Sequence, residues 1–451
     1  MSTDGPFLLV VAVEASADLH GAAVLRELKV LLPGLRAFGA AGPLLRAEGV
    51  EALVRAEDLS VMGIAEVLPA LPRIFAALGR LGRVARERRP RAALLIDSPD
   101  FNLRLAKRLR RLGVRVVYFI GPSVWAWRTY RVRQIARDVT RMLVILPFEA
   151  AFYAQHGVQA IYVGNPLADE LRPQLGPAPG PGPQPQLGSP GAPPRSAEQG
   201  GLAQQAGQGA RAQKAAQPQA AKAQEAGQGG QAQQGGRAQA PDRALLRARL
   251  GLDPARPLLA LLPGSRKQEI HRLWAPLLGA AKLLVARHPG LQLAVPVAKT
   301  IARSSLEPAA REAGLELHFL DSQAPALLAA ADLAIVASGT ATLEAALAQV
   351  PLVVVYRLSW LSWVIGRLLV RVKFVSLVNL LAGRRLVPEL LQSDCTSEAI
   401  AREADALLAP GPGRDDQLRG LRQILDELAP AAAPHAARRA AAEVASVLEA
   451  P

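Results

Sequence analysis

The stretch Ala92–Asn102, AALLIDSPDFN, joins a short apolar run to two carboxylates and an amide. The run Ala92–Ile96 is aliphatic throughout, which is typical of a strand buried on both faces of a parallel sheet. We expect Asp97 and Asp100 at its carboxyl end, where open parallel sheets bind their ligands. Two interpretations stay open at this point: the acids are catalytic, or they cap a helix that begins near Leu103.

Similar strand-like runs recur on both sides of this stretch and alternate with helical patterns. In the N-terminal part they are Leu8–Val13, Ala93–Ile96, Val114–Ile120 and Met142–Leu146, and in the C-terminal part Leu258–Leu262, Leu291–Pro296, Leu315–Leu320, Leu333–Ala337 and Leu352–Val355. Helices are expected between them, for example Arg272–Arg287 and Thr342–Ala348. The alternation predicts an α/β protein of two doubly wound, Rossmann-like domains that face each other across a cleft.

A change of composition separates the two series of strands. From residue 173 to 241, Pro, Gly, Gln and Ala dominate, and such a segment cannot bury enough apolar surface to offset its ordering entropy. We therefore predict a first domain over 1–172, a disordered, flexible insertion over 173–241 and a second domain over 242–413. Residues 414–451, rich in Ala, Arg and Leu, are expected to form a helical tail, interrupted near Pro430 and Pro434, that packs back on the domains.

The composition limits the partners of a chain of this kind. A net charge of +15 predicts attraction to phosphates, nucleic acid or an acidic membrane surface, and an aromatic content of 4% argues against a base-stacking surface for nucleic acid. A single cysteine, Cys395, excludes an internal disulfide and suits a reducing cytosol. The apolar start Phe7–Val13 is expected to be a strand rather than a signal peptide, and nothing is expected to span a bilayer.

The first of two phosphate-type turns is Leu262–Ile270, LPGSRKQEI, which follows a buried strand and opens a helix. Gly264 allows close approach of a ligand to the backbone, and the free N–H groups of the first helical turn favour an anion. The planar guanidinium of Arg266 can grip a diphosphate. The alternative is an ordinary helix start in which Ser265 and Glu269 form a capping box.

The second turn, Val336–Glu344, repeats this arrangement with the sequence VASGTATLE. Ser338, Gly339 and Thr340 are expected to expose backbone N–H groups suited to phosphate. Glu344 would accept hydrogen bonds from a ribose diol, or would simply complement the helix dipole. Two such turns in one domain favour a nucleoside diphosphate. The sequence has no Asp-x-Asp pair and no Cys/His ligand spacing, so we expect neither a metal nor another cofactor.

Polar residues also follow the first strand. Glu14, Ser16 and Asp18 are expected on the side of the cleft, although an ordinary helix cap is the favoured interpretation for Asp18 alone. No Gly-x-Gly-x-x-Gly follows this strand, which argues against a nicotinamide or flavin dehydrogenase. Another strand leads into Gly121–Arg128, GPSVWAWR, for whose two tryptophans composition favours core packing.

The stretch Ser359–Leu381, SWLSWVIGRLLVRVKFVSLVNLL, mixes tryptophans and aliphatic residues with cations. We interpret it as an interfacial helix whose arginines reach lipid phosphates; a buried helix and strand is the alternative. The residues expected to meet an anionic membrane are Trp360, Trp363, Arg367, Arg371 and Lys373.

Taken together, the motifs resemble those of the lipid-A-disaccharide synthase family. They are Glu14–Gly21, Ser60–Val67, Asp97–Asn102, Pro122–Arg128, Leu146–Glu149, Gly164–Pro166, Leu262–Arg266, Ser338–Glu344 and Asn379–Arg384. The resemblance runs from about residue 7 to 410 outside the insertion. The chain departs from the family pattern at Ala17 (usually Gly), Asn165 (usually His), Val378 (usually Pro) and Arg385 (commonly Glu).

The resemblance implies a GT-B glycosyltransferase that is inverting and independent of metal. The family joins UDP-2,3-diacylglucosamine to 2,3-diacylglucosamine 1-phosphate and gives the β-1,6-linked lipid A disaccharide 1-phosphate and UDP. It also implies a cytoplasmic protein that is peripheral on the inner face of the inner membrane and that can form a homodimer.

Carried over residue by residue, the resemblance assigns roles to the motifs. Asp100 falls on the family's proposed base, with Asp97 as the reserve. The expected UDP-binding residues are Gly264, Ser265, Arg266, Glu269, Ser338, Gly339, Thr340, Glu344 and Asn379, and those of the acceptor side are Glu14, Ser16, Asp18 and Met62. Two rivals are another GT-B enzyme acting on a UDP-sugar (a peptidoglycan-type glycosyltransferase or an epimerase) and a non-catalytic basic protein that binds membrane or nucleic acid.

Overall fold

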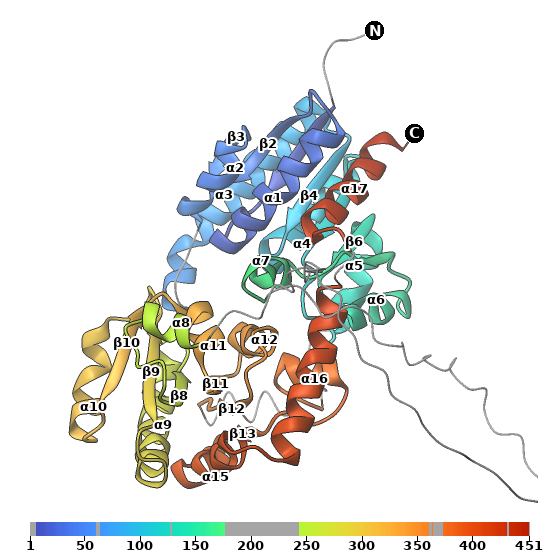
Figure 1. Ribbon diagram of the computed structural model, residues 1–451. Coiled ribbons are helices and arrows are strands. Elements are labelled where there is room, and N and C mark those ends of the chain that lie inside the picture. Colours follow the sequence, from blue (N-terminus) through green and yellow to red (C-terminus); the bar gives the residue numbers. More distant parts are fainter. Residues whose placement is uncertain are drawn as a thin grey trace, which may run out of the picture. The chain divides into compact units, whose positions relative to one another are not determined.

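The structure is a computed structural model that describes residues 6–59, 64–126, 129–175, 243–359, 363, 373–430 and 433–450. These residues form two β-sheets, one built from strands that precede the 173–241 segment in the sequence and one from strands that follow it (Figure 1). Of that segment only residues 173–175 are described, as the end of helix α7 (Pro166–Leu175).

The N-terminal sheet has seven parallel strands in the order β3-β2-β1-β4-β5-β6-β7. They are β1 (Phe7–Val11), β2 (Arg36–Ala41), β3 (Glu51–Arg55), β4 (Ala92–Ile96), β5 (Arg115–Phe119), β6 (Arg141–Val144) and β7 (Ala160–Tyr162). The helices of this part are α1 (Ala15–Leu31), α2 (Pro43–Ala47), α3 (Ile64–Arg88), α4 (Pro99–Arg111), α5 (Val132–Asp138), α6 (Pro147–Ala154) and α7. The order of the strands reverses between β1 and β4, which is where doubly wound sheets bind ligands.

The C-terminal sheet has six parallel strands in the order β10-β9-β8-β11-β12-β13. They are β8 (Leu258–Leu262), β9 (Gln292–Val297), β10 (Leu317–Asp321), β11 (Leu333–Ala337), β12 (Leu352–Tyr356) and β13 (Glu389–Leu391). The helices are α8 (Arg243–Arg249), α9 (Lys267–Arg287), α10 (Glu307–Glu312), α11 (Ala324–Ala330), α12 (Thr340–Leu347), α14 (Leu377–Ala382), α15 (Ser397–Leu408), α16 (Pro412–Leu428) and α17 (Ala436–Glu449).

The alternation of side chains along β1 shows how the N-terminal sheet is covered. Leu9 and Val11 pack into one apolar cluster with residues of α3 and α4, whereas Leu8 and Val10 pack into another with α1 and the C-terminal helix α17. Because successive side chains of a strand point to opposite faces, both faces of the sheet are buried. Figure 1 shows α17 beside α1, the element that it contacts most.

The nine strands expected from the sequence are all present, and the α/β class is confirmed. Four strands were not predicted from the sequence: β2, β3, β7 and β13, which lie toward the sheet edges and are short or carry charged residues. Three helix starts were predicted too late. Helix α4 begins at Pro99 rather than near Leu103, α9 at Lys267 rather than Arg272, and α12 at Thr340 rather than Thr342. In each case a polar residue of the motif, namely Asp100, Glu269 or Thr340, lies in the first helical turn.

Candidate functional site

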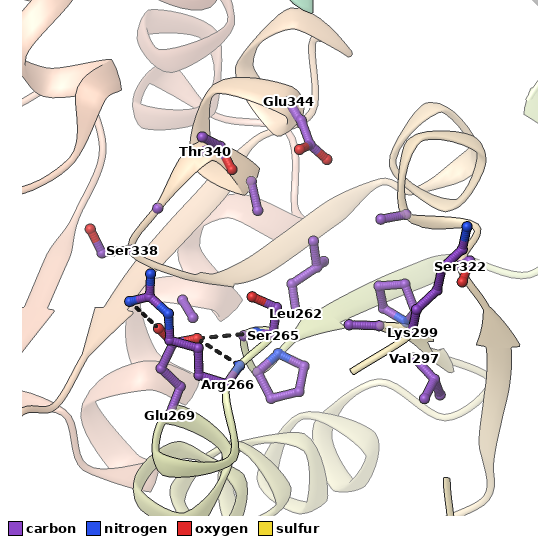
Figure 2. Close-up of a pocket in the computed structure, with 18 of the residues that line it drawn as sticks. Leu262, Ser265, Arg266, Glu269, Val297, Lys299, Ser322, Ser338, Thr340 and Glu344 are labelled. Carbon is purple, nitrogen blue, oxygen red and sulfur yellow. Dashed lines mark hydrogen bonds and ion pairs between the residues drawn. The ribbon is translucent and has the colours of Figure 1, made fainter. Parts of the chain in front are cut away.

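A cavity of about 590 Å³ lies at the carboxyl ends of strands β8, β9, β11 and β12 (Figure 2). Eight of the nine residues expected to bind UDP line it: Gly264, Ser265, Arg266, Glu269, Ser338, Gly339, Thr340 and Glu344. The two phosphate-type turns, far apart in the sequence, therefore form one site, because β8 and β11 are neighbours in the sheet. A volume of this size is typical of small-molecule sites.

The turn before α9 is wrapped around the carboxylate of Glu269. Its Oε2 accepts hydrogen bonds from the backbone N–H groups of Ser265 (3.1 Å) and Arg266 (3.3 Å). Gly264 has a φ of +107°, and a Cβ added there would lie 2.4 Å from Glu269 Oε2, so this turn requires glycine. The N-cap residue of α9 is Arg266 rather than Ser265, which corrects the register of the expected capping box.

The cation of this turn is accessible. The Arg266 side chain is 80% exposed, and its Nη1 lies 3.5 Å from Glu269 Oε1. A contact of this length at the surface holds a guanidinium weakly. Arg266 is therefore free to turn toward an anion in the cavity.

The second turn presents small polar groups. Helix α12 begins at Thr340, which is exposed like Gly339, whereas Ser338 is half-buried. The buried Thr342 donates its hydroxyl hydrogen to Gly339 O (2.8 Å), which fixes the start of the helix. Glu344 follows one turn later, and burial raises its pKa, with a further contribution from the charge of Glu170.

The cavity also contains polar residues that the sequence analysis missed, namely Lys299, Ser322 and Tyr356. Lys299 is exposed and follows β9, so a search for cations after each predicted strand would have found it. Its neighbour Thr300 donates a hydrogen bond to Ser265 O (2.6 Å), which ties the two strand ends together. No local pattern marks Ser322, whose position depends on the neighbouring strands.

Asn379, the ninth expected residue, does not line the cavity. It is fully buried, and its Nδ2 donates to Val387 O (3.0 Å) and to Glu389 Oε1 (2.8 Å). Its Oδ1 accepts from the backbone N–H groups of Leu386 (2.8 Å) and Val387 (2.9 Å). The amide therefore clamps the segment after α14, and a role in binding UDP stays a prediction.

In the N-terminal half, Asp97 directly follows β4 and has a strained backbone conformation. Asp97 and Ser98 have φ values of +50° and +44°, which residues other than glycine adopt rarely. Hydrogen bonds hold them there: Tyr118 Oη (2.6 Å) and Asn102 Nδ2 (2.8 Å) both donate to Asp97 O. Burial raises the pKa of Asp97, and the nearby charge of Glu14 raises it further.

Glu14 shares this edge of the sheet, because it follows β1, the neighbour of β4. The Ser98 hydroxyl donates a hydrogen bond to Glu14 Oε1 (2.7 Å). Glu14 and Ser16 are both exposed. The structure thus brings Glu14 and the strained Asp97–Ser98 turn together.

Asp100 has a different environment. Its side chain is 71% exposed in the first turn of α4, and its Oδ1 lies 2.7 Å from Arg131 Nη2. Its charge is therefore already engaged by a guanidinium. Asp97 and Asp100 therefore differ both in how deeply they are buried and in the residues that they contact.

Asp18 is a helix cap, but for a helix other than its own. It is 2% exposed and accepts hydrogen bonds from the backbone N–H groups of Gly42 (2.9 Å), Leu44 (2.8 Å) and Leu45 (3.1 Å), at the start of α2. Asp18 thus lies in the first turn of α1, while its carboxylate caps α2. Met62, the remaining acceptor-side candidate, lies outside the described residues.

Only part of the expected membrane-facing stretch is described. Trp363 is half-buried, and the exposed Lys373 places its Nζ 5.5 Å from the ring centroid of Phe374. Trp360, Arg367 and Arg371 lie outside the described residues. Within the part of the chain that the structure describes, no helix is long and apolar enough to cross a membrane, and no group of three or more His, Cys, Asp or Glu residues is placed to hold a metal ion.

Comparisons with known proteins agree with the motifs. The family model described as lipid-A-disaccharide synthetase matches residues 8–176 and 237–440. A lipid-A-disaccharide synthase of Anaeromyxobacter dehalogenans (strain 2CP-1 / ATCC BAA-258) is 45% identical over 442 residues, which are 98% of this chain and 97% of that protein.

Two solved structures share the fold. A putative UDP-N-acetylglucosamine 2-epimerase from Listeria monocytogenes has a TM-score of 0.54 at 11% identity, covering 99% of this chain and 96% of its own. The glycosyltransferase of kitacinnamycin has a TM-score of 0.53 at 15% identity, covering 99% and 100%. At such identities the likeness concerns the GT-B fold alone. The family model and the 45% identical relative, by contrast, show that this chain belongs to the lipid-A-disaccharide synthase family.

Proposed function

We propose that this chain transfers a diacylglucosamine from UDP-2,3-diacylglucosamine to 2,3-diacylglucosamine 1-phosphate with inversion. The products are the β-1,6-linked lipid A disaccharide 1-phosphate and UDP. The observation that carries the proposal is the cavity in which both phosphate-type turns, at Gly264–Arg266 and Ser338–Thr340, line the same space.

On the donor side, the turns before α9 and α12 offer backbone N–H groups to the diphosphate of UDP. Arg266 and Lys299 supply positive charge, which stabilises the negative charge that develops on the departing UDP. Glu344 lies deeper, where a carboxylate can accept hydrogen bonds from the ribose. Asn379 contributes from outside the cavity, by holding the segment that follows α14.

The geometry favours a different residue as the general base from the one that the sequence favoured. A general base must accept a proton from the attacking hydroxyl, and a pKa nearer to neutrality helps it. Asp97 is partly buried beside Glu14 and has a raised pKa, whereas Asp100 is exposed and paired with Arg131. We therefore propose Asp97 as the base and Asp100, the first choice from the sequence, as the alternative.

The acceptor is proposed to bind near Glu14 and Ser16, which are exposed at the same edge of the N-terminal sheet as Asp97. Asp18 would act through α2, which it caps. Met62 keeps the acceptor-side role that the family resemblance gives it.

Attachment to the membrane belongs to the proposal, since both substrates are lipids. We propose a cytoplasmic protein at the inner face of the inner membrane that is held through Trp360, Trp363, Arg367, Arg371 and Lys373. A homodimer is likewise proposed. Flotation with anionic vesicles tests the first statement and analytical ultracentrifugation tests the second.

A two-substrate assay tests the activity. The purified chain is incubated with UDP-2,3-diacylglucosamine, with and without 2,3-diacylglucosamine 1-phosphate, and both UDP and the mass of the lipid product are measured. We expect UDP only when the acceptor is present, with a product of the mass of a disaccharide 1-phosphate. Release of UDP without acceptor, or an epimerised UDP-sugar, contradicts the proposal.

Asp97→Asn and Asp100→Asn form a matched pair of variants in the same assay. Loss of a general base lowers the rate by about 10²- to 10⁴-fold. We expect a loss of that size for Asp97→Asn, with UDP affinity retained, and less than about 10-fold for Asp100→Asn. The reverse order would assign the base to Asp100.

A further inference from the structure

Asn102, the amide of the stretch Ala92–Asn102, is fully buried in α4 and carries an unsatisfied atom. Its Nδ2 donates hydrogen bonds to the carbonyl oxygens of Ile96 (3.0 Å) and Asp97 (2.8 Å). Within the described part of the chain, its Oδ1 has no hydrogen-bond partner. A buried acceptor without a partner lowers the stability of a protein. The amide is therefore kept at this position for its NH₂ group, which alone has partners.

A second buried side chain donates to the same carbonyl oxygen of Asp97. Tyr118 lies in β5, the neighbour of β4, and is 0% exposed, and its Oη lies 2.6 Å from Asp97 O. Burial raises the pKa of the Tyr118 hydroxyl well above its ordinary 10, so this group stays a donor. The backbone N–H of Asp97 in turn donates to Phe119 O (3.0 Å), also in β5. Both backbone polar groups of Asp97 are thus held by β5 and α4.

The backbone that these bonds hold is strained at two consecutive residues. The φ values of Asp97 (+50°) and Ser98 (+44°) lie in the left-handed region, which is unfavourable for residues with a Cβ. The Asp97 side chain lies half-buried beside Glu14 in this conformation. Without the two side-chain donors, we expect the turn to relax to an ordinary φ and to carry the carboxylate away from this place.

We propose that Asn102 and Tyr118 are positioning residues for glycosyl transfer: they hold Asp97 in the strained conformation that presents its carboxylate to the hydroxyl of the acceptor. The inference rests on the proposed function, with Asp97 as the base. Neither Asn102 nor Tyr118 is exposed, so neither touches a substrate, and both act through the backbone of Asp97.

Tyr118→Phe and Asn102→Ala each remove one of the two donors. A displacement of about 1 Å lowers the rate by about 100-fold, so we expect kcat to fall about 10- to 100-fold in each variant. The KM for the acceptor and the Kd for UDP should stay within about 3-fold, because the base is misplaced while the groups that bind substrate are unchanged.

Tyr153→Phe is the matched control for Tyr118→Phe. Tyr153 is also fully buried in the N-terminal half, and its hydroxyl also donates to a backbone oxygen, Pro122 O (2.9 Å). The two variants should lose similar stability, but kcat of Tyr153→Phe should stay within about 2-fold of the wild type. Equal losses of kcat in the two variants overturn the proposal.

The pH dependence of kcat/KM separates positioning from a loss of stability. Burial and the charge of Glu14 raise the pKa of Asp97, so wild-type activity should be lost at a higher pH, on acidification, than an ordinary aspartate would give. A carboxylate that has left this place regains its ordinary pKa, so the loss should move to lower pH in Tyr118→Phe and Asn102→Ala. An acid limb that is the same in both variants as in the wild type contradicts the proposal.

Substitutions of Ser98 test the strain itself. Ser98→Gly and Ser98→Ala both remove the hydroxyl that donates to Glu14, but only glycine adopts a positive φ freely. Combined with Tyr118→Phe, the glycine variant should turn over at least about 5-fold faster than the alanine variant, because it returns to the left-handed conformation at less cost. Equal rates would mean that the strain plays no part.

Hydrogen exchange measured by mass spectrometry needs no enzymatic activity. The N–H groups of Phe101 and Asn102 donate to Ser98 O (3.1 and 2.9 Å), so they report on the strained turn. A peptide that covers the start of α4 should exchange faster in Tyr118→Phe and Asn102→Ala, but not in Tyr153→Phe. If it does and the wild type transfers no sugar, the proposed function fails while the hold on Asp97 stands. Unchanged exchange in both variants refutes the hold.

Discussion

Replacing Asp18 separates a structural role from a role in binding the acceptor. Asp18 is buried in α1, and its carboxylate takes three backbone N–H groups at the start of α2, a helix of five residues. Ser16, two residues earlier and exposed, is the matched control. Because both residues were expected on the acceptor side, variants of the two are compared in the same assays.

The size of the effect follows from these contacts. A hydrogen bond to a charged group contributes about 1.5 to 3 kcal/mol, and a buried donor left without a partner costs about 1 to 3 kcal/mol. Without Asp18, some of the three N–H groups of α2 can form hydrogen bonds with water, which reduces the total cost. We therefore expect Asp18→Ala to destabilise the N-terminal half by about 3 to 5 kcal/mol. Asp18→Asn keeps one acceptor oxygen and should cost about 1 to 3 kcal/mol, and Ser16→Ala less than about 0.5 kcal/mol.

Hydrogen exchange measured by mass spectrometry is the suitable assay, because a chain with two sheets need not unfold in one step. Peptides that cover α2 and β2 should lose protection in Asp18→Ala, while those of the C-terminal sheet stay unchanged. The reasoning is refuted if α2 keeps its protection while acceptor turnover collapses, since Asp18 would then act on substrate rather than on the fold.

Two further predictions concern buried polar groups. Asn379→Ala leaves the N–H group of Val387 without its acceptor, whereas that of Leu386 keeps a second acceptor, Arg384 O (2.9 Å), and the change should destabilise the C-terminal half by about 1 to 3 kcal/mol in urea unfolding; unchanged stability with weaker UDP binding would instead make Asn379 a direct ligand. For Glu149, the folded pKa of about 7 lies above the ordinary 4.5, so the unfolded state loses its proton first as pH rises. The stability of the wild type relative to Glu149→Gln should therefore be highest below pH 4.5 and should fall by about 3 kcal/mol by pH 8, at about 1.4 kcal/mol per pKa unit, when unfolding is followed over that range; an increase with pH contradicts the assignment.

The sequence by itself determined the class of fold and located the two turns of the proposed donor site. Buried parallel strands are near-continuous aliphatic runs, which is a strong local signal, and nine of them were located from it. The turns at Gly264–Arg266 and Ser338–Thr340 were also visible, because a glycine or hydroxyl residue between a strand and a helix is a local pattern. That they share one cavity follows from the adjacency of β8 and β11.

Tertiary structure alone decided the roles of single polar residues. Asp18 and Asn379 have the composition of ligands, yet they hold backbone N–H groups 24 and 7 residues away, and no local pattern encodes such partners. Asp97 and Asp100 are three residues apart and alike in sequence, but one is half-buried beside Glu14 and the other is exposed beside Arg131. The chemistry of a carboxylate depends on its burial and its neighbours, and both are set by strands and helices that meet only in the folded chain.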